Sequence, residues 1–236
     1  MPKTSNSPRT ARALAHEEMQ RRILNAARQQ LATVGPAQLS LRAIAREIGV
    51  VSSAIYRYVA SRDELITRLI MDSFTTLADT IAQACAQAKA EPTVQFSTWA
   101  QTLRSWALEH PYDWALIYGI PIPGYAAPID TIEPARRVND PVLALYGRLQ
   151  PDLHAGPTID AAEAALDPLR SMLEQHYAAG PGTFGVATAM LMAWSSIHGF
   201  ISLELGGHFQ GSTTDTDVVF QGIVRELALQ LIGHKE

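Results

Sequence analysis

The stretch that decides the fold is LSLRAIAREIGVVSSAIYRYVASRDEL, residues 39–65. Leu41 and Ile48 stand seven residues apart on the apolar stripe of a two-turn helix. Gly49 then permits a tight turn, and a second short helix can place Ile55 against the first. A short helix, a glycine-containing turn and another short helix are typical of the helix-turn-helix motif, so we expect that motif here.

The second short helix carries the residues that face DNA in this interpretation. With Ile55 turned to the core, the side chains near the exposed face are Ser52, Ser53, Ala54, Tyr56, Arg57 and Tyr58. Ala54 can touch a thymine methyl group, and Arg57 can donate two hydrogen bonds to guanine. Tyr56 and Tyr58 are expected to contact phosphate oxygens through their hydroxyls. The alternative for Tyr56 is a half-buried position against the first helix of the domain.

Charge is divided unevenly along the chain. Residues 1–70 carry 11 Lys and Arg against 5 Asp and Glu, a net of +6, although the whole chain has a net charge of −4. A basic part joined to an acidic part suggests that the first part binds a polyanion. The alternative is that the basic residues form only solvated surface.

Apolar residues recur at helical rather than alternating spacing along the whole chain, so the predicted fold is all-α. Ser40 is expected to begin one helix as its N-cap, and Ser61 with Glu64 forms a capping box before Leu65. The predicted helices span residues 12–34, 41–48, 52–58, 62–87, 93–109, 111–118, 134–149, 159–178, 183–206 and 216–232. Between them, the proline-rich residues 119–134 read as a loop that either covers a pocket mouth or connects passively.

Several classes of protein are excluded by composition and motifs. Polar residues interrupt every apolar run, so we expect no membrane-spanning helix, and the N-terminus lacks the apolar stretch of a secretion signal. A single cysteine, Cys85, excludes an internal disulfide and a cysteine-based metal cluster. No nucleophile elbow, phosphate loop or zinc-protease motif is present, so we expect no enzyme, no cofactor and no metal, and a cytoplasmic location.

Residues 20–70, which include RRILNAARQQLATVG and the stretch quoted above, resemble the N-terminal domain of the tetracycline-repressor (TetR) family of transcriptional regulators. The resemblance implies a three-helix DNA-binding domain. It also implies DNA contacts from the residues at the matching positions, which are Ser40, Arg42, Ser52, Ser53, Ala54, Tyr56, Tyr58 and Arg62. Arg42 and Arg62 lie near helix N-termini, which favour phosphate.

Aromatic and histidine side chains mark the acidic remainder of the chain. All four tryptophans lie there, and large apolar rings with a few polar groups suit a small-molecule site. The candidate ligand-binding residues are Trp99, Leu103, Trp106, Trp114, Tyr118, His176, Trp194 and His198. The alternative for each is ordinary core packing.

The segment WSSIHGFISLELGGHF, residues 194–209, is similar to the Trp-His-Gly region of one C-terminal subgroup of TetR-like regulators. This resemblance implies an effector cavity and a homodimer formed through the last two helices, at about 183–206 and 216–232. Apolar residues surround much of the first of these helices, more than one packing face requires. The alternative is a central core helix of a monomer.

We therefore expect a homodimeric repressor that binds an inverted-repeat operator in double-stranded DNA and is released by a small-molecule effector. The expected domains are a flexible basic arm at 1–15, a helix-turn-helix domain at 16–62, and a helical effector-binding and dimerisation domain at 63–236. The alternative is an all-α small-molecule-binding protein that does not read DNA.

Overall fold

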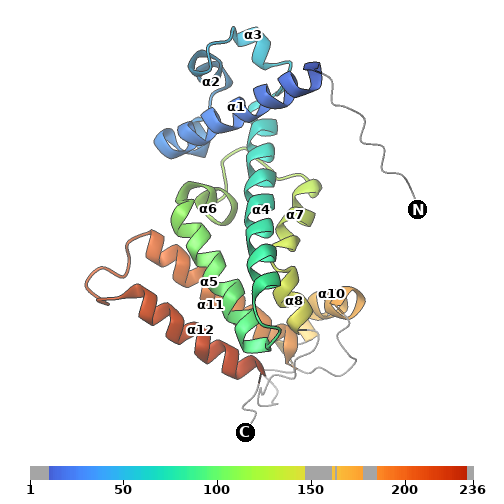
Figure 1. Cartoon of the computed structure of the whole chain (residues 1–236), viewed down its shortest axis with the longest axis vertical. Helices are drawn as coiled ribbons and strands as arrows, with labels where there is room; N and C mark the ends of the chain where they lie inside the picture. Colours follow the sequence, from blue (N-terminus) through green and yellow to red (C-terminus); the bar gives the residue numbers. More distant parts are fainter. Residues whose placement is uncertain (1–10, 147–160, 163, 178–184, 233–236) are drawn as a thin grey trace. The chain divides into compact units, whose positions relative to one another are not determined.

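The computed structural model of the protein describes residues 11–146, 161–162, 164–177 and 185–232 (Figure 1). Within these ranges every regular element is a helix, which confirms the prediction of an all-α fold. The described residues form two compact units. The first contains those up to Ser73 together with Tyr112–Thr131, and the second contains Phe74–Pro111 and those from Ile132 onward.

The helices mostly follow the predicted ranges. The first unit contains α1 (Ala11–Val34), η1 (Pro36–Gln38), α2 (Leu41–Glu47), α3 (Ser52–Ile55), α6 (Pro111–Tyr118) and η2 (Ile129–Thr131). The second contains α5 (Pro92–Glu109), α7 (Ile132–Arg137), α8 (Asp140–Tyr146), α10 (Asp167–Tyr177), α11 (Val186–Leu205) and α12 (Thr216–Ile232). The long helix α4 (Arg62–Gln87) gives its first half to one unit and its second half to the other.

Two predicted boundaries differ from this division. Helix α1 already includes residues 11–15, which we assigned to the flexible arm, whereas residues 1–10 lie outside the described residues. The boundary predicted between residues 62 and 63 falls at the start of α4, but the compact units divide within that helix. The first unit also gains residues 112–131, which the sequence analysis placed in the second domain.

A cluster of charged side chains explains why α6 belongs to the first unit. The Arg28 Nε on α1 donates to the Asp113 Oδ1 on α6 at 3.2 Å, and the same guanidinium pairs with Asp72 on α4. The Ser73 hydroxyl donates to the same Asp113 oxygen at 2.5 Å, and Asp113 is buried. Three helices that are far apart in sequence are thereby joined through one arginine.

The predicted helix at 134–149 is wrong in its extent, because the chain forms α7 and α8 with a turn at Val138 and Asn139. Pro141 lacks the N–H that a continuous helix needs, so the helix breaks and restarts ahead of it. The Asn139 carbonyl then accepts from the Leu143 amide at 2.8 Å. Pro134 is tolerated inside α7 because it lies in the first turn, where no intrahelical N–H is needed. Residues 147–149 lie outside the described residues.

In the second unit, α5 packs against α8, α11 and α12 (Figure 1). The Arg104 side chain on α5 is buried and donates to both carboxylate oxygens of Glu204 on α11, at 2.7 and 2.6 Å. It also donates to Asp217 on α12 at 2.6 Å and lies over the Phe220 ring. Arg104 therefore holds the end of α11 and the start of α12 against α5, and its bonds lower the pKa of Glu204.

Replacement of Arg104 by Ala is expected to lower the free energy of unfolding by about 3–5 kcal/mol, because it leaves the Glu204 carboxylate, whose side chain is only 10% accessible, without its cation. Urea denaturation measures this change. The control is Arg170→Ala, which removes an exposed pair with Asp167 and is expected to cost about 0–1 kcal/mol. Equal losses in the two variants would contradict the structural role given to Arg104.

Helix α11 is the one helix among the described residues that is long and apolar enough to cross a membrane by length and composition. A core helix satisfies the same criteria, and half of the most apolar window of α11 is buried inside the protein. Its buried side includes Ala193, Ile197 and Ile201, as a core helix requires.

Candidate nucleic-acid interface

The helix-turn-helix is built from α2, a turn and α3 (Figure 1). Gly49 in the turn has a φ of +74°, a left-handed conformation that a side chain would disfavour. Ile44 on α2 and Ile55 on α3 are fully buried, so the two short helices share one apolar core with Ala27 of α1. The predicted motif is present at the predicted residues.

The regular helix α3 is shorter than the predicted range of 52–58. It ends at Ile55, and the chain continues to Tyr58 in tighter turns, with the Arg57 amide donating to the Ala54 carbonyl at 3.2 Å and the Tyr58 amide to the Ile55 carbonyl at 2.9 Å. Bonds of this i to i+3 type often end a helix. The residues up to Tyr58 therefore still follow a helical path around Ile55.

The polar side chains of this segment face solvent. Ser52, Ser53, Tyr56 and Arg57 are exposed, with 48% of Tyr56 accessible, whereas Ala54 and Tyr58 are half-buried. The Tyr58 ring also packs against the His16 ring of α1, with 4.9 Å between their centroids. The exposure of Tyr56 leaves it available to DNA, and both the DNA contact and the alternative half-buried position against the first helix stay predictions.

The sequence analysis missed one exposed residue, Val51, which precedes α3 and is 70% accessible. An apolar side chain held in water beside Ser52 and Ser53 is a further candidate for contact with a thymine methyl group. The sequence did carry a signal for Val51. It lies between the Gly49 turn and α3, outside the buried stripes of α2 and α3.

Ser40 and Arg42 occupy the start of α2. The Ser40 hydroxyl accepts from the Ala43 amide at 3.4 Å, which confirms the predicted N-cap. Arg42 is exposed in the first turn, where a helix favours a nearby phosphate. DNA contacts from both residues stay predictions.

Two other arginines brace this domain internally. The Arg62 guanidinium donates to the carbonyls of Pro36 at 2.9 Å and Ala37 at 3.2 Å, which ties the start of α4 to η1. The Arg22 guanidinium donates to the Ile48 carbonyl at 2.7 Å and so joins α1 to the end of α2. The phosphate contact predicted for Arg62 stays a prediction, and the structure adds this internal role.

The predicted capping by Ser61 at the start of α4 is confirmed, whereas the reciprocal bond of Glu64 goes to the amide of Ala60, one residue before the expected partner. The Glu64 amide donates to the Ser61 hydroxyl at 3.1 Å, and the Glu64 carboxylate accepts from the Ala60 amide at 2.6 Å. The Ala60 hydrogen bond, together with Arg68, lowers the pKa of Glu64. This capping determines where the segment after α3 ends and α4 begins.

The predicted ligand-binding residues are divided between the two units. Trp114 and Tyr118 lie on α6 in the first unit, with ring centroids 4.6 Å apart, and the other six lie in the second. Trp99 and Leu103 are fully buried, and the Trp99 indole N–H donates to the Val138 carbonyl at 3.1 Å. These residues are placed as core, and their ligand contacts stay predictions.

Three further predicted ligand residues differ in their surroundings. Trp106 is buried beside the His110 ring, and its indole nitrogen has no hydrogen-bond partner among the described residues. Trp194 is half-buried and stacks on His198, with 4.2 Å between centroids. His176 on α10 is exposed. A cavity of ligand size does occur in the first unit, but none of the eight predicted residues lines it.

Burial of His198 lowers its pKa from 6.5 to about 4, although its Nδ1–H donates to the Trp194 carbonyl at 2.9 Å. The folded protein therefore holds this ring neutral at a pH where the unfolded chain binds a proton. Stability attributable to His198 is present above pH 6.5 and is lost as the pH falls towards 4.

We expect this loss to reach about 3 kcal/mol, since each pKa unit corresponds to about 1.4 kcal/mol. Urea denaturation at pH values across this window measures it. His198→Phe keeps a ring beside Trp194 but removes the titration, so its stability should fall less steeply with acid. The control is His176→Phe at an exposed position. Identical pH slopes for the wild type and His198→Phe would contradict the assignment.

The described residues contain no group of three or more His, Cys, Asp or Glu side chains placed to hold a metal ion.

Comparison with known proteins covers both units. Residues 23–69 match the family of bacterial regulatory proteins named tetR, and residues 96–227 match the tetracyclin repressor-like C-terminal domain. The chain is 39% identical over 225 residues to HTH-type transcriptional regulator Rv1816 of Mycobacterium tuberculosis, covering 93% of this chain and 95% of that one.

Solved structures show the same fold. The regulatory protein SCO4313 superposes with a TM-score of 0.75 at 34% identity, covering 92% of this chain and 98% of that one. The TetR family regulator PfmR of Thermus thermophilus has a TM-score of 0.53 at 16% identity, covering 91% and 100% of the two chains, and shares the fold. The chain therefore belongs to the TetR family of bacterial helix-turn-helix transcriptional regulators.

Proposed function

We propose that this regulator binds an inverted-repeat operator as a homodimer, represses transcription there, and is released by a small-molecule effector. The observation that carries the DNA-binding part is the exposed polar face of α3 and the turns that follow it, where Ser52, Ser53 and Arg57 surround the buried Ile55. That face lies in the segment of residues 1–70, whose net charge is +6. Phosphate contacts would position this face, and Arg57 would read a base edge.

The homodimer is supported by the exposed side of α11. Between Leu191 and Leu203 the exposed residues of this helix are Leu191, Met192, Ser195, Ser196, Ser202 and Leu203. None is charged, although they face water in a single chain. Gly199 lies on the same side, and a Cβ added there would meet no atom of the described residues within 4 Å, so none of them requires a glycine at this position. Close approach of a second helix explains both features.

Helix α12 contributes a further apolar surface to the proposed interface. Val218 and Val219 are 63% and 40% accessible, and Gly222 also has open space beside it. Two copies of α11 and α12 would bury these residues in a four-helix bundle. The two-fold axis would then place the two α3 segments in successive major grooves, about 34–36 Å apart or a multiple of that distance.

An effector site in the second unit is proposed from the aromatic residues of α5 and α11. The buried indole nitrogen of Trp106 and the half-buried Trp194 ring offer a polar and an apolar contact. The likeness of residues 194–209 to the Trp-His-Gly subgroup supports the same location. An effector can release DNA only if it binds the DNA-incompetent state more tightly than the competent one.

TetR regulators are not enzymes, and we propose no catalytic activity for this chain. A regulator of this family acts where the chromosome is, so we propose a cytoplasmic location. The competing function is an all-α small-molecule-binding protein that does not read DNA. The exposed Ser52, Ser53 and Arg57 favour the regulator.

The test is the salt dependence of binding to a fluorescent DNA duplex of arbitrary sequence, measured by anisotropy. Phosphate-led binding predicts that the logarithm of the affinity falls linearly with the logarithm of salt concentration, with a slope of about −0.9 per phosphate contact. Arg42→Ala should make the slope shallower by about one per subunit. Arg170→Ala on α10 is the control. A flat response, or no binding at low salt, would favour the protein that does not read DNA.

A further inference from the structure

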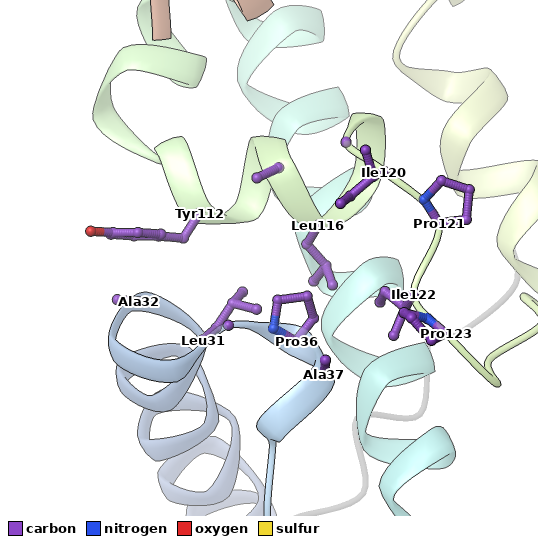
Figure 2. Close-up of a pocket in the computed structure, with 13 residues that line it drawn as sticks. Leu31, Ala32, Pro36, Ala37, Tyr112, Leu116, Ile120, Pro121, Ile122 and Pro123 are labelled. Carbon is purple, nitrogen blue, oxygen red and sulfur yellow. The ribbon is translucent and has the colours of Figure 1, made fainter. Parts of the chain in front are cut away.

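The first unit contains a cavity of about 390 Å³ that the regulatory mechanism above does not use. One wall comes from the end of α1 and η1, and the other from α6 and the residues that follow it (Figure 2). Its lining residues are Leu31, Ala32, Gly35, Pro36, Ala37, Tyr112, Ala115, Leu116, Gly119, Ile120, Pro121, Ile122 and Pro123. The volume lies within the range of small-molecule sites.

The chemistry of the lining is uniform. No lining residue is charged, and the Tyr112 hydroxyl is the one side-chain polar group in the set. Figure 2 shows Leu31, Pro36, Leu116 and Ile122 pointing toward one another across the cavity. Such a lining strongly disfavours an ionised ligand, because nothing there would replace the lost water.

The size of the cavity follows from small residues on both walls. Ala32, Gly35 and Ala37 on one side, and Ala115 and Gly119 on the other, carry at most a methyl group. Gly119 cannot be larger, since a Cβ there would lie 2.2 Å from the Ala115 carbonyl oxygen. These small side chains leave a hollow of about 390 Å³, a volume that suits a small molecule.

The loop wall is held in place before any ligand arrives. The Tyr125 amide donates to the Ile122 carbonyl at 3.1 Å, and Gly124 has a φ of +75°, as expected for a type II turn with Pro123 at its second position. The Tyr125 hydroxyl is hydrogen-bonded to Thr67 of α4 at 2.9 Å. A preformed wall reduces the entropy lost when a ligand binds.

Apolar surface at the rim is left in water. Ile120 is 89% accessible and Tyr112 is 51% accessible, whereas Leu31, Leu116 and Ile122 at the base are buried. A hydrocarbon ligand seated on the base would cover part of the rim and remove that surface from water.

We propose that this cavity is a binding site for an uncharged, largely hydrocarbon small molecule. The site is separate from the effector site proposed in the second unit, and it does not depend on DNA binding. The wall that Leu31 to Ala37 supply belongs to the helices that carry the helix-turn-helix.

The test titrates the full chain, without DNA, with N-phenylnaphthylamine, an uncharged aromatic amine whose fluorescence rises in apolar surroundings. We expect a saturable rise with one site per chain. Ala32→Phe places a ring in the cavity and should weaken binding by at least about tenfold. The matched control is Thr33→Phe, because Thr33 is the next residue of α1, is exposed and does not line the cavity.

A second variant and a competitor keep the result interpretable. Ala115→Leu fills the cavity from α6 with a good helix former and should weaken probe binding by a similar factor. It serves as the test variant if Ala32→Phe does not unfold cooperatively. Dodecanol should displace the probe at least about tenfold better than dodecanoate, because the cavity offers no partner to a carboxylate.

Three outcomes would overturn the proposal. The wild type gives no saturable signal, or the filling variants bind the probe as the Thr33→Phe control does, or the signal is lost in Trp194→Ala but kept in Ala32→Phe. The last result would place the probe in the second unit. A failure of DNA binding would leave each of these measurements unaffected.

Discussion

Replacement of Leu203 by Glu should dissociate the homodimer and abolish binding to the operator. Leu203 is 46% accessible on the uncharged side of α11, so the change is tolerated in a single chain and keeps a good helix former. In the proposed bundle, the two-fold axis buries two carboxylates without partners. Each costs several kcal/mol, so the dimer dissociation constant should rise by at least about a hundredfold.

Sedimentation velocity checks this prediction against the 25.7 kDa mass of one chain. The wild type should sediment with twice that mass, and Leu203→Glu with the mass of one chain and an unchanged helical circular dichroism. The matched control is Leu108→Glu on α5, since Leu108 has a similar accessibility of 43% but lies outside α11 and α12. If Leu203→Glu remains dimeric, the interface lies elsewhere.

Replacement of Tyr56 by Ala should lower operator affinity by about a hundredfold or more while leaving the dimer intact. Tyr56 ends α3 with half of its surface in water, so its removal leaves no cavity. A contact at the DNA surface is worth about 1–3 kcal/mol, and a homodimer loses it in both half-sites. Anisotropy with a labelled operator duplex measures the loss.

The conservative variant identifies which part of Tyr56 acts. Tyr56→Phe keeps the ring but removes the hydroxyl that we expect to bind phosphate, so it should lose most of what Tyr56→Ala loses. Full affinity in Tyr56→Phe would show that the ring, not the hydroxyl, makes the contact. Loss of the dimer or of cooperative unfolding in Tyr56→Ala would show that the residue is structural.

Local features of this fold were predictable from sequence because they depend on residues close together in the chain. The α2 start at Ser40, the Gly49 turn and the Ser61–Glu64 capping box each depend on side chains within a few positions. The apolar spacing from Leu41 likewise predicted the buried side of α2. The same spacing failed at 134–149, where Pro141 outweighed the periodic pattern.

Features that join distant residues were not predictable in the same way. The bond from Arg28 to Asp113 spans 85 positions, and that from Arg104 to Glu204 spans 100, so no local pattern indicates either. The first joins α6 to α1, and residues of both helices line the apolar cavity. For the same reason the aromatic residues predicted as one ligand cluster are divided between two units.

We propose that two α3 segments of one dimer read DNA, and selection of binding sites from a random duplex pool tests this proposal most directly. The purified protein is mixed with the pool at low salt, and the bound fraction is sequenced. We predict enrichment of an inverted repeat whose half-site centres lie about one helical turn apart or a multiple of it. No enrichment by a protein shown to be folded would contradict it.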